Sequence, residues 1–335
     1  MIVFFPTYAR RRPGEGGWRA TVAGMVSRPL PPRSPRRRLG IAVLRRLLSL
    51  DETDVDSEIF RRRVEWFLFQ RVAGQRVRIA VGDRIIDAGH SDKTGHFRVE
   101  FDLDDAEVAG TAGQLAYAAV PDDASEPPVT GDTGSIHLVA PEGVSVISDI
   151  DDTVKVSNVA NRRELLRNTL VRDFMAVPGM PGVYRDWRSR DVAFHYVSAS
   201  PWQLSRGLSG FLAEAGLPAG SMHLKLFRLK DSTPLGRLPS RKRSKRRVIE
   251  QIMADFPGRR FLLVGDSGER DPEVYAAVRR RRPQQVTGIA IRRVEARSPA
   301  WKVQARLAKL GDRLPAGSFH VFETPEELAP LLPDG

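Results

Sequence analysis

The sequence contains no cysteine among its 335 residues, so no disulfide can stabilise the fold. This agrees with the cytoplasmic location that we expect, with peripheral contact at a membrane as a further expectation. Aromatic residues make up only 7% of the chain, and every apolar run is shorter than the roughly 18 residues of a transmembrane helix. The N-terminus places its apolar residues before its arginines, the reverse of a secretory signal. Secreted disulfide-rich and membrane-spanning classes are therefore not expected.

Positive charge is what the chain has in excess. Its 53 Lys and Arg against 41 Asp and Glu give a formal net charge of +12. Such a balance favours anionic partners, among them nucleic acid, anionic lipid and phosphorylated substrates. An arginine- and alanine-rich sequence can also reflect genome composition, so the net charge does not identify a substrate.

The first 140 residues predict a region that begins with a basic, proline-rich segment. Four prolines between positions 29 and 35 oppose a regular helix there, although residues 18–26 could form a strand. Short helices are predicted at 39–50 and 55–70, the second with Asp54 as its N-cap. A basic amphipathic helix of this kind can lie on a membrane surface or pack against its own domain.

From residue 75 the apolar side chains alternate, which predicts short strands. The predicted strands cover residues 76–81, 84–86, 96–103, 114–120 and 135–139, with a polar loop at 121–134. Together they predict a small β-sandwich domain that ends near residue 140.

The pattern changes in the second domain, residues 141–335, where apolar strands alternate with helices. Strands are predicted at 144–148, 192–197, 261–264 and 286–291, and helices at 162–173, 181–187, 201–215, 245–256 and 272–282. This is typical of an α/β fold with a doubly wound parallel sheet. Functional side chains gather at the C-terminal ends of the strands in such a sheet.

Three carboxylates follow the first of these strands within four positions: Asp149, Asp151 and Asp152. Two carboxylates about 4 Å apart repel each other by roughly 4 kcal/mol at an effective dielectric near 20. A cation or a proton is therefore expected to neutralise this cluster.

Polar residues follow the other strands as well. Ser198 comes after the second strand, Asp266 and Asp271 come after the third, and Lys245 begins the helix between them. A carboxylate pair, a hydroxyl, an amine and a second acidic loop suit phosphoryl transfer assisted by Mg²⁺.

These motifs carry a family resemblance over about residues 140–295. The order Asp-x-Asp-x-Thr, Ser, Lys and Gly-Asp-x-x-x-x-Asp resembles the haloacid-dehalogenase-like phosphotransferases. Within that superfamily, the segments SDIDDTVK, YVSASPWQL and FLLVGDSGERDPEVY resemble the actin-patch-type phosphatidate phosphatase catalytic family. The resemblance implies a haloacid-dehalogenase-like Rossmannoid fold that hydrolyses phosphatidate to diacylglycerol and phosphate.

The resemblance also implies a role for each motif residue. Asp149 would be the nucleophile that forms an aspartyl-phosphate, and Asp151 would be the general acid and then the general base. Ser198 and Lys245 would bind the phosphoryl oxygens, while Thr153 would stiffen the turn and take part in substrate binding.

The implied cofactor is Mg²⁺. Its ligands would be the Asp149 carboxylate, the backbone carbonyl of Asp151 and Asp266. Asp271 would support the metal or orient Lys245.

Neighbouring residues have plainer interpretations. Asp152 is expected to be a cap or an outer group, and Ser200 to N-cap a helix that begins at Pro201.

Lys242 is the alternative to Lys245, because the basic run 241–247 allows the register to slip. That run is either a solvated loop or an electrostatic funnel beside the lysine. Packed core positions are expected for His195, Trp187 and Trp202, and solvated ones for Glu269 and Arg270.

Other functions remain open at this stage. The same chemistry could act on a nucleotide or a nucleic-acid phosphate end, drawn in by the basic surface. A non-catalytic anion-binding module on the same fold is the alternative from another class. The expected partner is a phosphorylated small molecule or lipid, and the sequence does not give the oligomeric state.

Overall fold

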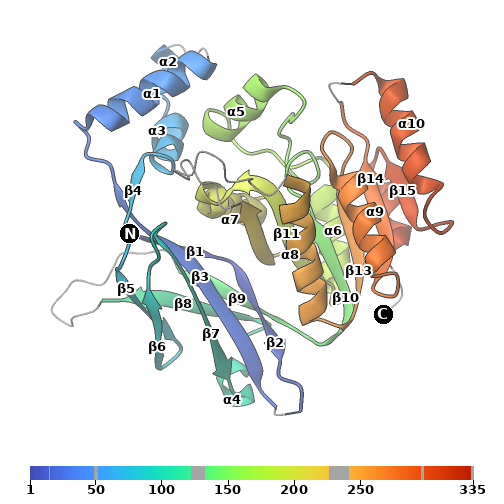
Figure 1. The fold of residues 1–335 in the computed structure, drawn as a ribbon, viewed down its shortest axis with the longest axis horizontal. Coiled ribbons are helices and arrows are strands. Elements are labelled where there is room, and N and C mark those ends of the chain that lie inside the picture. Colours follow the sequence, from blue (N-terminus) through green and yellow to red (C-terminus); the bar gives the residue numbers. More distant parts are fainter. Residues whose placement is uncertain (15, 49–51, 122–132, 226–240, 296–297, 333–335) are drawn as a thin grey trace. The chain divides into compact units, whose positions relative to one another are not determined.

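A computed structural model describes residues 1–14, 16–48, 52–121, 133–225, 241–295 and 298–332 (Figure 1). The chain forms two compact units: an N-terminal unit, Met1–Ala140 with Gly220–Met222, and a C-terminal unit, Pro141–Ala219 with His223–Gly335. Among the helices in these ranges, none is long and apolar enough to cross a membrane.

Nine strands of the N-terminal unit join in one mixed sheet. Seven of them follow the order β1-β3-β2-β9-β8-β5-β6, while β4 and β7 pair with β3. The strands are β1 Ile2–Phe5, β2 Thr7–Arg11, β3 Trp18–Pro29, β4 Phe69–Arg71, β5 Arg76–Val81, β6 Arg84–His90, β7 His96–Leu103, β8 Gln114–Val120 and β9 Gly134–Val139. The predicted strands are present here, but they join one sheet over the described residues, so the β-sandwich is not confirmed.

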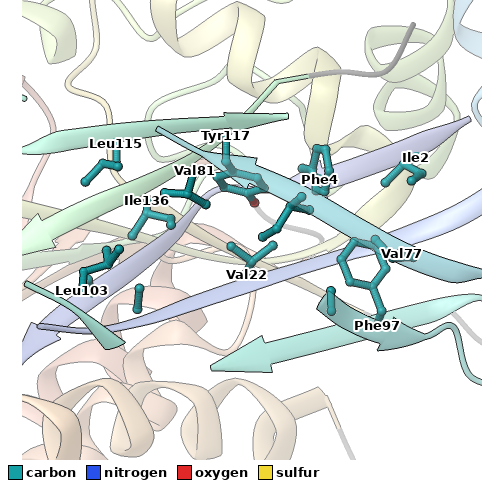
Figure 2. Close-up of a cluster of buried hydrophobic side chains, with 14 of the residues drawn as sticks. Ile2, Phe4, Val22, Val77, Val81, Phe97, Leu103, Leu115, Tyr117 and Ile136 are labelled. Atoms are coloured by element: carbon teal, nitrogen blue, oxygen red, sulfur yellow. The ribbon is translucent and has the colours of Figure 1, made fainter. Parts of the chain in front are cut away.

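The core of this unit comes from alternating apolar side chains on the strands. Figure 2 shows Phe4, Val22, Val77, Phe97 and Tyr117 directed into one cluster. The rings of Phe4 and Tyr117 meet edge to face with centroids 4.8 Å apart. Full burial of one such aliphatic or aromatic side chain stabilises a fold by roughly 1.5–3 kcal/mol.

The helical segment of this unit differs from the prediction. Its helices are α1 Pro35–Leu48, α2 Glu52–Asp56 and α3 Glu58–Glu65, and α4 Asp105–Val108 lies further along the chain. The single helix predicted at 55–70 is broken at Ser57, which has extended backbone angles and accepts a hydrogen bond from the Phe60 N–H at 3.2 Å. The N-cap assigned to Asp54 was therefore wrong, because the hydroxyl of Ser57 caps α3.

The C-terminal unit contains a six-stranded sheet in the order β12-β11-β10-β13-β14-β15. Strand β10 is parallel to β11 and β13, and β13, β14 and β15 continue in parallel. The elements are β10 Glu142–Ser148, α5 Arg162–Leu170, α6 Met180–Ser189, β11 Ala193–Pro201, η1 Trp202–Leu204, α7 Ser205–Glu214, β12 Ser221–Lys225, α8 Arg241–Asp255, β13 Gly258–Asp266, α9 Asp271–Arg281, β14 Val286–Arg292, α10 Ala300–Gly311, β15 Phe319–Phe322 and η2 Pro325–Leu331. The predicted α/β class with a parallel sheet is confirmed.

Strand β10 marks the point where the strand order reverses, since the chain continues to β11 on one side and to β13 on the other. Helices α8 and α9 contact each other and lie in front of the strands in Figure 1. Ser148, the last residue of β10, is paired with Tyr196 of β11 and with Val264 of β13. The segments that follow these strands therefore start side by side, at the edge where α/β proteins bind ligands.

Arg259 connects the N-terminal ends of β10 and β13, at the sheet edge opposite the one described above. The residue is only 3% exposed, and its Nε donates to Ser145 Oγ at 2.7 Å. Its guanidinium also donates to the carbonyl oxygens of Glu142 and Val144. Burial lowers the pKa of Arg259 to about 10, so the group stays charged at neutral pH.

Candidate active site

Three buried carboxylates meet at the carboxyl edge of the parallel sheet. Asp149 follows β10, Asp266 ends β13 and Asp271 begins α9, and each is no more than 2% exposed. One ligand oxygen from each lies within 4.8 Å of the others. The backbone fixes this convergence, because the Asp149 N–H donates to Val264 O at 2.9 Å.

Lys245, from the first turns of α8, is the cation bound directly to this cluster. Its Nζ donates to Asp149 Oδ1 at 2.7 Å and to Asp271 Oδ1 at 2.6 Å, with 9% of the side chain exposed. Burial lowers the pKa of Lys245, but the charges of Asp149 and Asp271 outweigh burial and raise it well above the usual value. The lysine is thus held charged between two acids.

One ammonium does not neutralise three carboxylates. Burial raises the pKa of Asp149, Lys245 opposes this, and the neighbouring acids Asp271, Asp266 and Asp151 raise it further. Burial likewise raises the pKa of Asp266, again with Asp271 adding to the shift and Lys245 opposing it. The cluster therefore has a deficit of positive charge that a proton or a metal ion would satisfy.

Asp266 presents one oxygen to this space without a partner. Its Oδ1 accepts the N–H groups of Gly268 at 2.6 Å and Glu269 at 3.1 Å. Its Oδ2 is buried and has no hydrogen-bond partner. A buried carboxylate oxygen without a donor is costly, and hard cations such as Mg²⁺ bind such oxygens. The donor set and this orphaned oxygen fit a divalent cation.

The carboxylate of Asp151 is not in the group of three but in a network of its own. Its Oδ1 accepts from Lys155 Nζ at 3.0 Å and from Ser157 Oγ at 2.6 Å. Its Oδ2 accepts from Ser200 Oγ at 2.6 Å and from Ser198 Oγ at 3.3 Å. Burial raises the pKa of Asp151, but Lys155 and these hydroxyl donors outweigh burial and lower it to about 2.

Lys155 and Ser157 are site residues that the sequence reasoning missed. Lys155 is 1% exposed, and its Nζ lies 5.0 Å from the centroid of the Phe174 ring while it binds Asp151. Its position four residues after Asp151 was the available signal, but a lysine at that spacing is common on solvated surfaces.

Asp152 shapes the turn that follows Asp149. It adopts a left-handed backbone conformation with φ +53°, and its carboxylate accepts the N–H groups of Ser157, Asn158 and Val159 at 2.6–2.8 Å. Asp152 is therefore a cap of this turn, as predicted. Thr153 is fully buried and is not among the residues that line the cleft described below.

Ser200 has a different role from the predicted one. No helix begins at Pro201; strand β11 continues through it, and η1 starts at Trp202 without a side-chain cap. The hydroxyl of Ser200 instead donates to Asp151, while its N–H donates to Ser198 Oγ at 2.9 Å. Because β11 extends through Pro201 and the Ser200 hydroxyl binds Asp151, the N-cap prediction was wrong.

A cleft of about 910 Å³ opens onto this edge of the sheet. Ser198, Lys245 and Asp271 line it, and apolar side chains lie beside them, including Leu165 and Leu166 of α5. Glu269 and Arg270, predicted as solvated, also line the cleft, as do the basic residues Lys302 and Arg306 of α10. The side chain of Lys242 lies outside the described residues, so the alternative to Lys245 is not tested.

Three other predictions concerned the core. His195 is fully buried, with its ring 5.8 Å from that of Phe256. Trp187 and Trp202 are 0% and 3% exposed. Their predicted packed positions are confirmed.

Replacing Ser200 by alanine is expected to lower the free energy of unfolding by about 1–2 kcal/mol near neutral pH, because a donor to a buried carboxylate is lost. The folded pKa of Asp151, about 2, lies below its usual value of 3.8, so its stabilisation is full above pH 4 and is lost as the pH falls through 2. The stability deficit of the variant should therefore shrink toward pH 2. Urea unfolding from about pH 5 to the lowest pH at which the fold persists measures this.

Ser189→Ala is the matched control, because its exposed hydroxyl donates only to a backbone carbonyl, Asp186 O at 2.7 Å. That variant should differ little from the wild type at any pH. A Ser200→Ala deficit that stays constant with pH would contradict the bond to an ionised Asp151.

The fold and the site together define an α/β protein with an acidic cluster and one lysine at the carboxyl edge of a parallel sheet. Within it, residues 144–293 match the family model described as phosphatidate phosphatase APP1, catalytic domain. This segment of the chain is similar to that family of catalytic domains.

Two relatives are similar to this chain. Phosphatidate phosphatase APP1 of Saccharomyces cerevisiae is 29% identical over 258 residues, which cover 71% of this chain and 41% of the yeast protein. An uncharacterised protein of Schizosaccharomyces pombe is 33% identical over 156 residues, 45% of this chain and 25% of that protein. The chain thus spans less than half of the length of these relatives.

A solved structure of a carbohydrate esterase aligns with 92% of this chain and 95% of its own. The sequence identity is 11% and the TM-score is 0.22.

Proposed function

We propose that this chain is a Mg²⁺-dependent phosphomonoester hydrolase of the haloacid-dehalogenase-like type, which acts through an aspartyl-phosphate and takes phosphatidate as its substrate. The observation that carries the proposal is the cluster of Asp149, Asp266 and Asp271 around Lys245, with an unpartnered Asp266 oxygen, beside the cleft. A scaffold has no need of this repulsion between buried acids, which argues against a purely binding role.

The residues that would hold Mg²⁺ are Asp149, Asp266 and Asp271, together with the backbone carbonyl of Asp151. The carboxylate oxygens of these three aspartates are close enough to share one ion. When bound, the ion would neutralise the carboxylates and the phosphate, and would polarise the phosphorus–oxygen bonds.

In this proposal Asp149 attacks phosphorus with a carboxylate oxygen, and the bond from phosphorus to the leaving oxygen breaks. Asp151 donates a proton to that oxygen, then takes one from the water that cleaves the aspartyl-phosphate. Because the pKa of Asp151 is about 2 in the free protein, it must rise when a phosphate binds. The negative charge of a bound phosphate has this effect.

Lys245 and Ser198 would bind the phosphoryl oxygens. Both line the cleft, and Lys245 already orients Asp149 through its 2.7 Å hydrogen bond. Preorganised donors of this kind stabilise the charge that develops in the transition state.

Two features support a lipid phosphate as the substrate. The yeast relative is named a phosphatidate phosphatase. The cleft also combines the basic residues Lys302 and Arg306 with the apolar residues Leu165 and Leu166, which suits a phosphate joined to an apolar group. A membrane that presents phosphatidate is then the partner that we expect.

The test measures phosphate release from phosphatidate, p-nitrophenyl phosphate and a nucleoside monophosphate, over a range of Mg²⁺ concentrations. We expect turnover to require Mg²⁺, to stop with EDTA and to favour phosphatidate. Asp266→Asn should raise the Mg²⁺ concentration for half-maximal rate by about 100-fold or more, because a ligand is lost.

Glu269→Gln is the comparison variant in the same loop. Its N–H donates to Asp266 Oδ1 and its charge raises the pKa of Asp266, but its carboxylate is not in the group of three, so its effect on the Mg²⁺ requirement should be far smaller. Turnover that is insensitive to EDTA would rule out the metal requirement. A preference for the nucleoside monophosphate would mean that the substrate is a nucleotide rather than a lipid, while the proposed chemistry would still hold.

A further inference from the structure

Helix α1 is strongly basic and has no acidic residue. Its sequence PRRRLGIAVLRRLL contains five arginines, at positions 36, 37, 38, 45 and 46. Such one-sided charge along a single helix is not needed for packing and indicates an anionic partner.

One face of α1 is fixed to its own unit. Arg37 donates to the carboxylate of Glu65, at the end of α3. A Cβ atom on Gly40 would lie 2.7 Å from a methyl carbon of Leu68, so glycine allows the helix to approach closely there. These contacts determine which side of α1 faces away from the rest of the N-terminal unit.

The outward side carries apolar residues where polar ones are normally found. Leu39 is 66% exposed and Val43 is 47% exposed, and they are four positions apart on one face of the helix. Arg36 and Arg46 extend this face by about one turn at each end, and both are exposed. Leu39, Val43, Arg36 and Arg46 form what we call the α1 stripe.

We propose that the α1 stripe docks on an anionic lipid bilayer, with the helix axis in the plane of the interface. The apolar pair would enter the boundary between head groups and acyl chains, while the arginines would contact lipid phosphates. Helices that combine these two features bind the interface without crossing it. A polynucleotide would use the arginines but would gain nothing from an exposed leucine and valine.

The experiment uses the full chain and flotation with two kinds of vesicle. One is pure phosphatidylcholine, and the other contains about 30% phosphatidylserine to supply an anionic surface. Neither lipid is a phosphate monoester, so binding through the proposed phosphatase site does not contribute. We expect binding to the anionic vesicles, weakened by salt, and little binding to the neutral ones.

Two double variants separate the contributions. Leu39→Ser with Val43→Ser should weaken binding to anionic vesicles about tenfold or more, through lost apolar burial. Arg36→Gln with Arg46→Gln should weaken it about 25-fold, at about fivefold for each arginine. Circular dichroism should be unchanged, because all four side chains are exposed.

Matched controls are Ile85→Ser on β6 and Trp301→Ser on α10, which remove side chains that are 54% and 66% exposed outside the stripe. Both should bind like the wild type. Equal losses from these controls, or wild-type binding by both stripe variants, would overturn the proposal. So would tight polynucleotide binding that falls with the arginine pair while vesicle binding is absent. Turnover plays no part in the assay, so its outcome is independent of the proposed phosphatase activity.

Discussion

Replacement of Asp149 by asparagine is expected to reduce the proposed phosphatase turnover by at least about 10⁴-fold, while the fold is retained. The amide has the shape of the carboxylate but is too weak a nucleophile to displace the leaving oxygen. Losses of this size are typical when the covalent nucleophile of an enzyme is removed. The amide oxygen can still accept the hydrogen bond that Lys245 now donates to Asp149 Oδ1.

The measurement has two parts. Steady-state phosphate release gives the loss of turnover, and acid quenching with labelled substrate shows whether phosphate becomes covalently attached to the protein. We expect attachment in the wild type and none in Asp149→Asn. Thermal unfolding should show that the variant is at least as stable as the wild type, because one charge of a repelling cluster is gone.

Asp152→Asn is the control for this experiment. It makes the same change three residues further on, in a carboxylate that only accepts backbone N–H groups. Turnover within about tenfold of wild type is expected, with a stability loss of about 1–2 kcal/mol. If Asp149→Asn keeps full turnover, Asp149 is not the nucleophile.

The strand-end motifs were predictable because parallel strands bring their carboxyl ends to one edge. Asp149, Lys245 and the loop that carries Asp266 and Asp271 are far apart in the chain, yet the alternation of strands and helices was enough to expect them together. Local patterns gave the elements, and the convergence of the C-terminal strand ends in an α/β sheet gave their common edge.

Tertiary partners, in contrast, were not predictable from local patterns. Ser200 looks like a helix cap because it precedes proline, but the continuation of β11 directs it to Asp151. Lys155 looks like a surface lysine, and only the fold shows that it is buried against Phe174. Both depend on where the turn after β10 places the Asp151 side chain.

Strands β1 and β2 were missed for a related reason. The prolines and arginines of the first 38 residues suggested irregular structure, although β1 and β2 lie in the sheet. Strand β1 is stabilised by its pairing with β3, from Ile2 opposite Val26 to Phe5 opposite Ala23. Such long-range pairing overrides the local composition.

Replacement of Lys245 by methionine is expected to lower the free energy of unfolding by about 3–5 kcal/mol at neutral pH in the presence of EDTA. The change removes the ammonium from between Asp149 and Asp271 and leaves buried acids without their bound cation. Removal of one partner of a buried ion pair typically costs this much, because the remaining charge stays desolvated. Urea unfolding measures the loss.

Lys302→Met is the matched control, since Lys302 lines the same cleft but is exposed. Its effect should stay within about 0.5 kcal/mol. A similar loss in both lysine variants would mean that the cleft, rather than the buried pairing, determines the effect.

The pH dependence of Lys245→Met provides a separate test of the same electrostatics. Asp149 and Asp266 have folded pKa values above the usual carboxyl range, and loss of the lysine raises them further. A carboxyl whose pKa is raised by folding takes up its proton at a higher pH in the folded state than in the unfolded state. Lowering the pH toward the unfolded pKa, near 4, therefore stabilises the folded state. The deficit of the variant should therefore be largest at neutral pH and smallest near pH 4.

Mg²⁺ should stabilise Lys245→Met as protons do, because it also neutralises the buried carboxylates. If Mg²⁺ binds these acids, a concentration about 100 times the dissociation constant stabilises the folded state by about 2.7 kcal/mol, which is most of the loss caused by Lys245→Met. Mg²⁺ should restore the stability of Lys245→Met but not that of the double variant Lys245→Met with Asp266→Asn. This result would show that the stabilisation by Mg²⁺ depends on the orphaned Asp266 oxygen. A deficit that responds to neither protons nor Mg²⁺ would mean that lost packing, and not unbalanced charge, destabilises the variant.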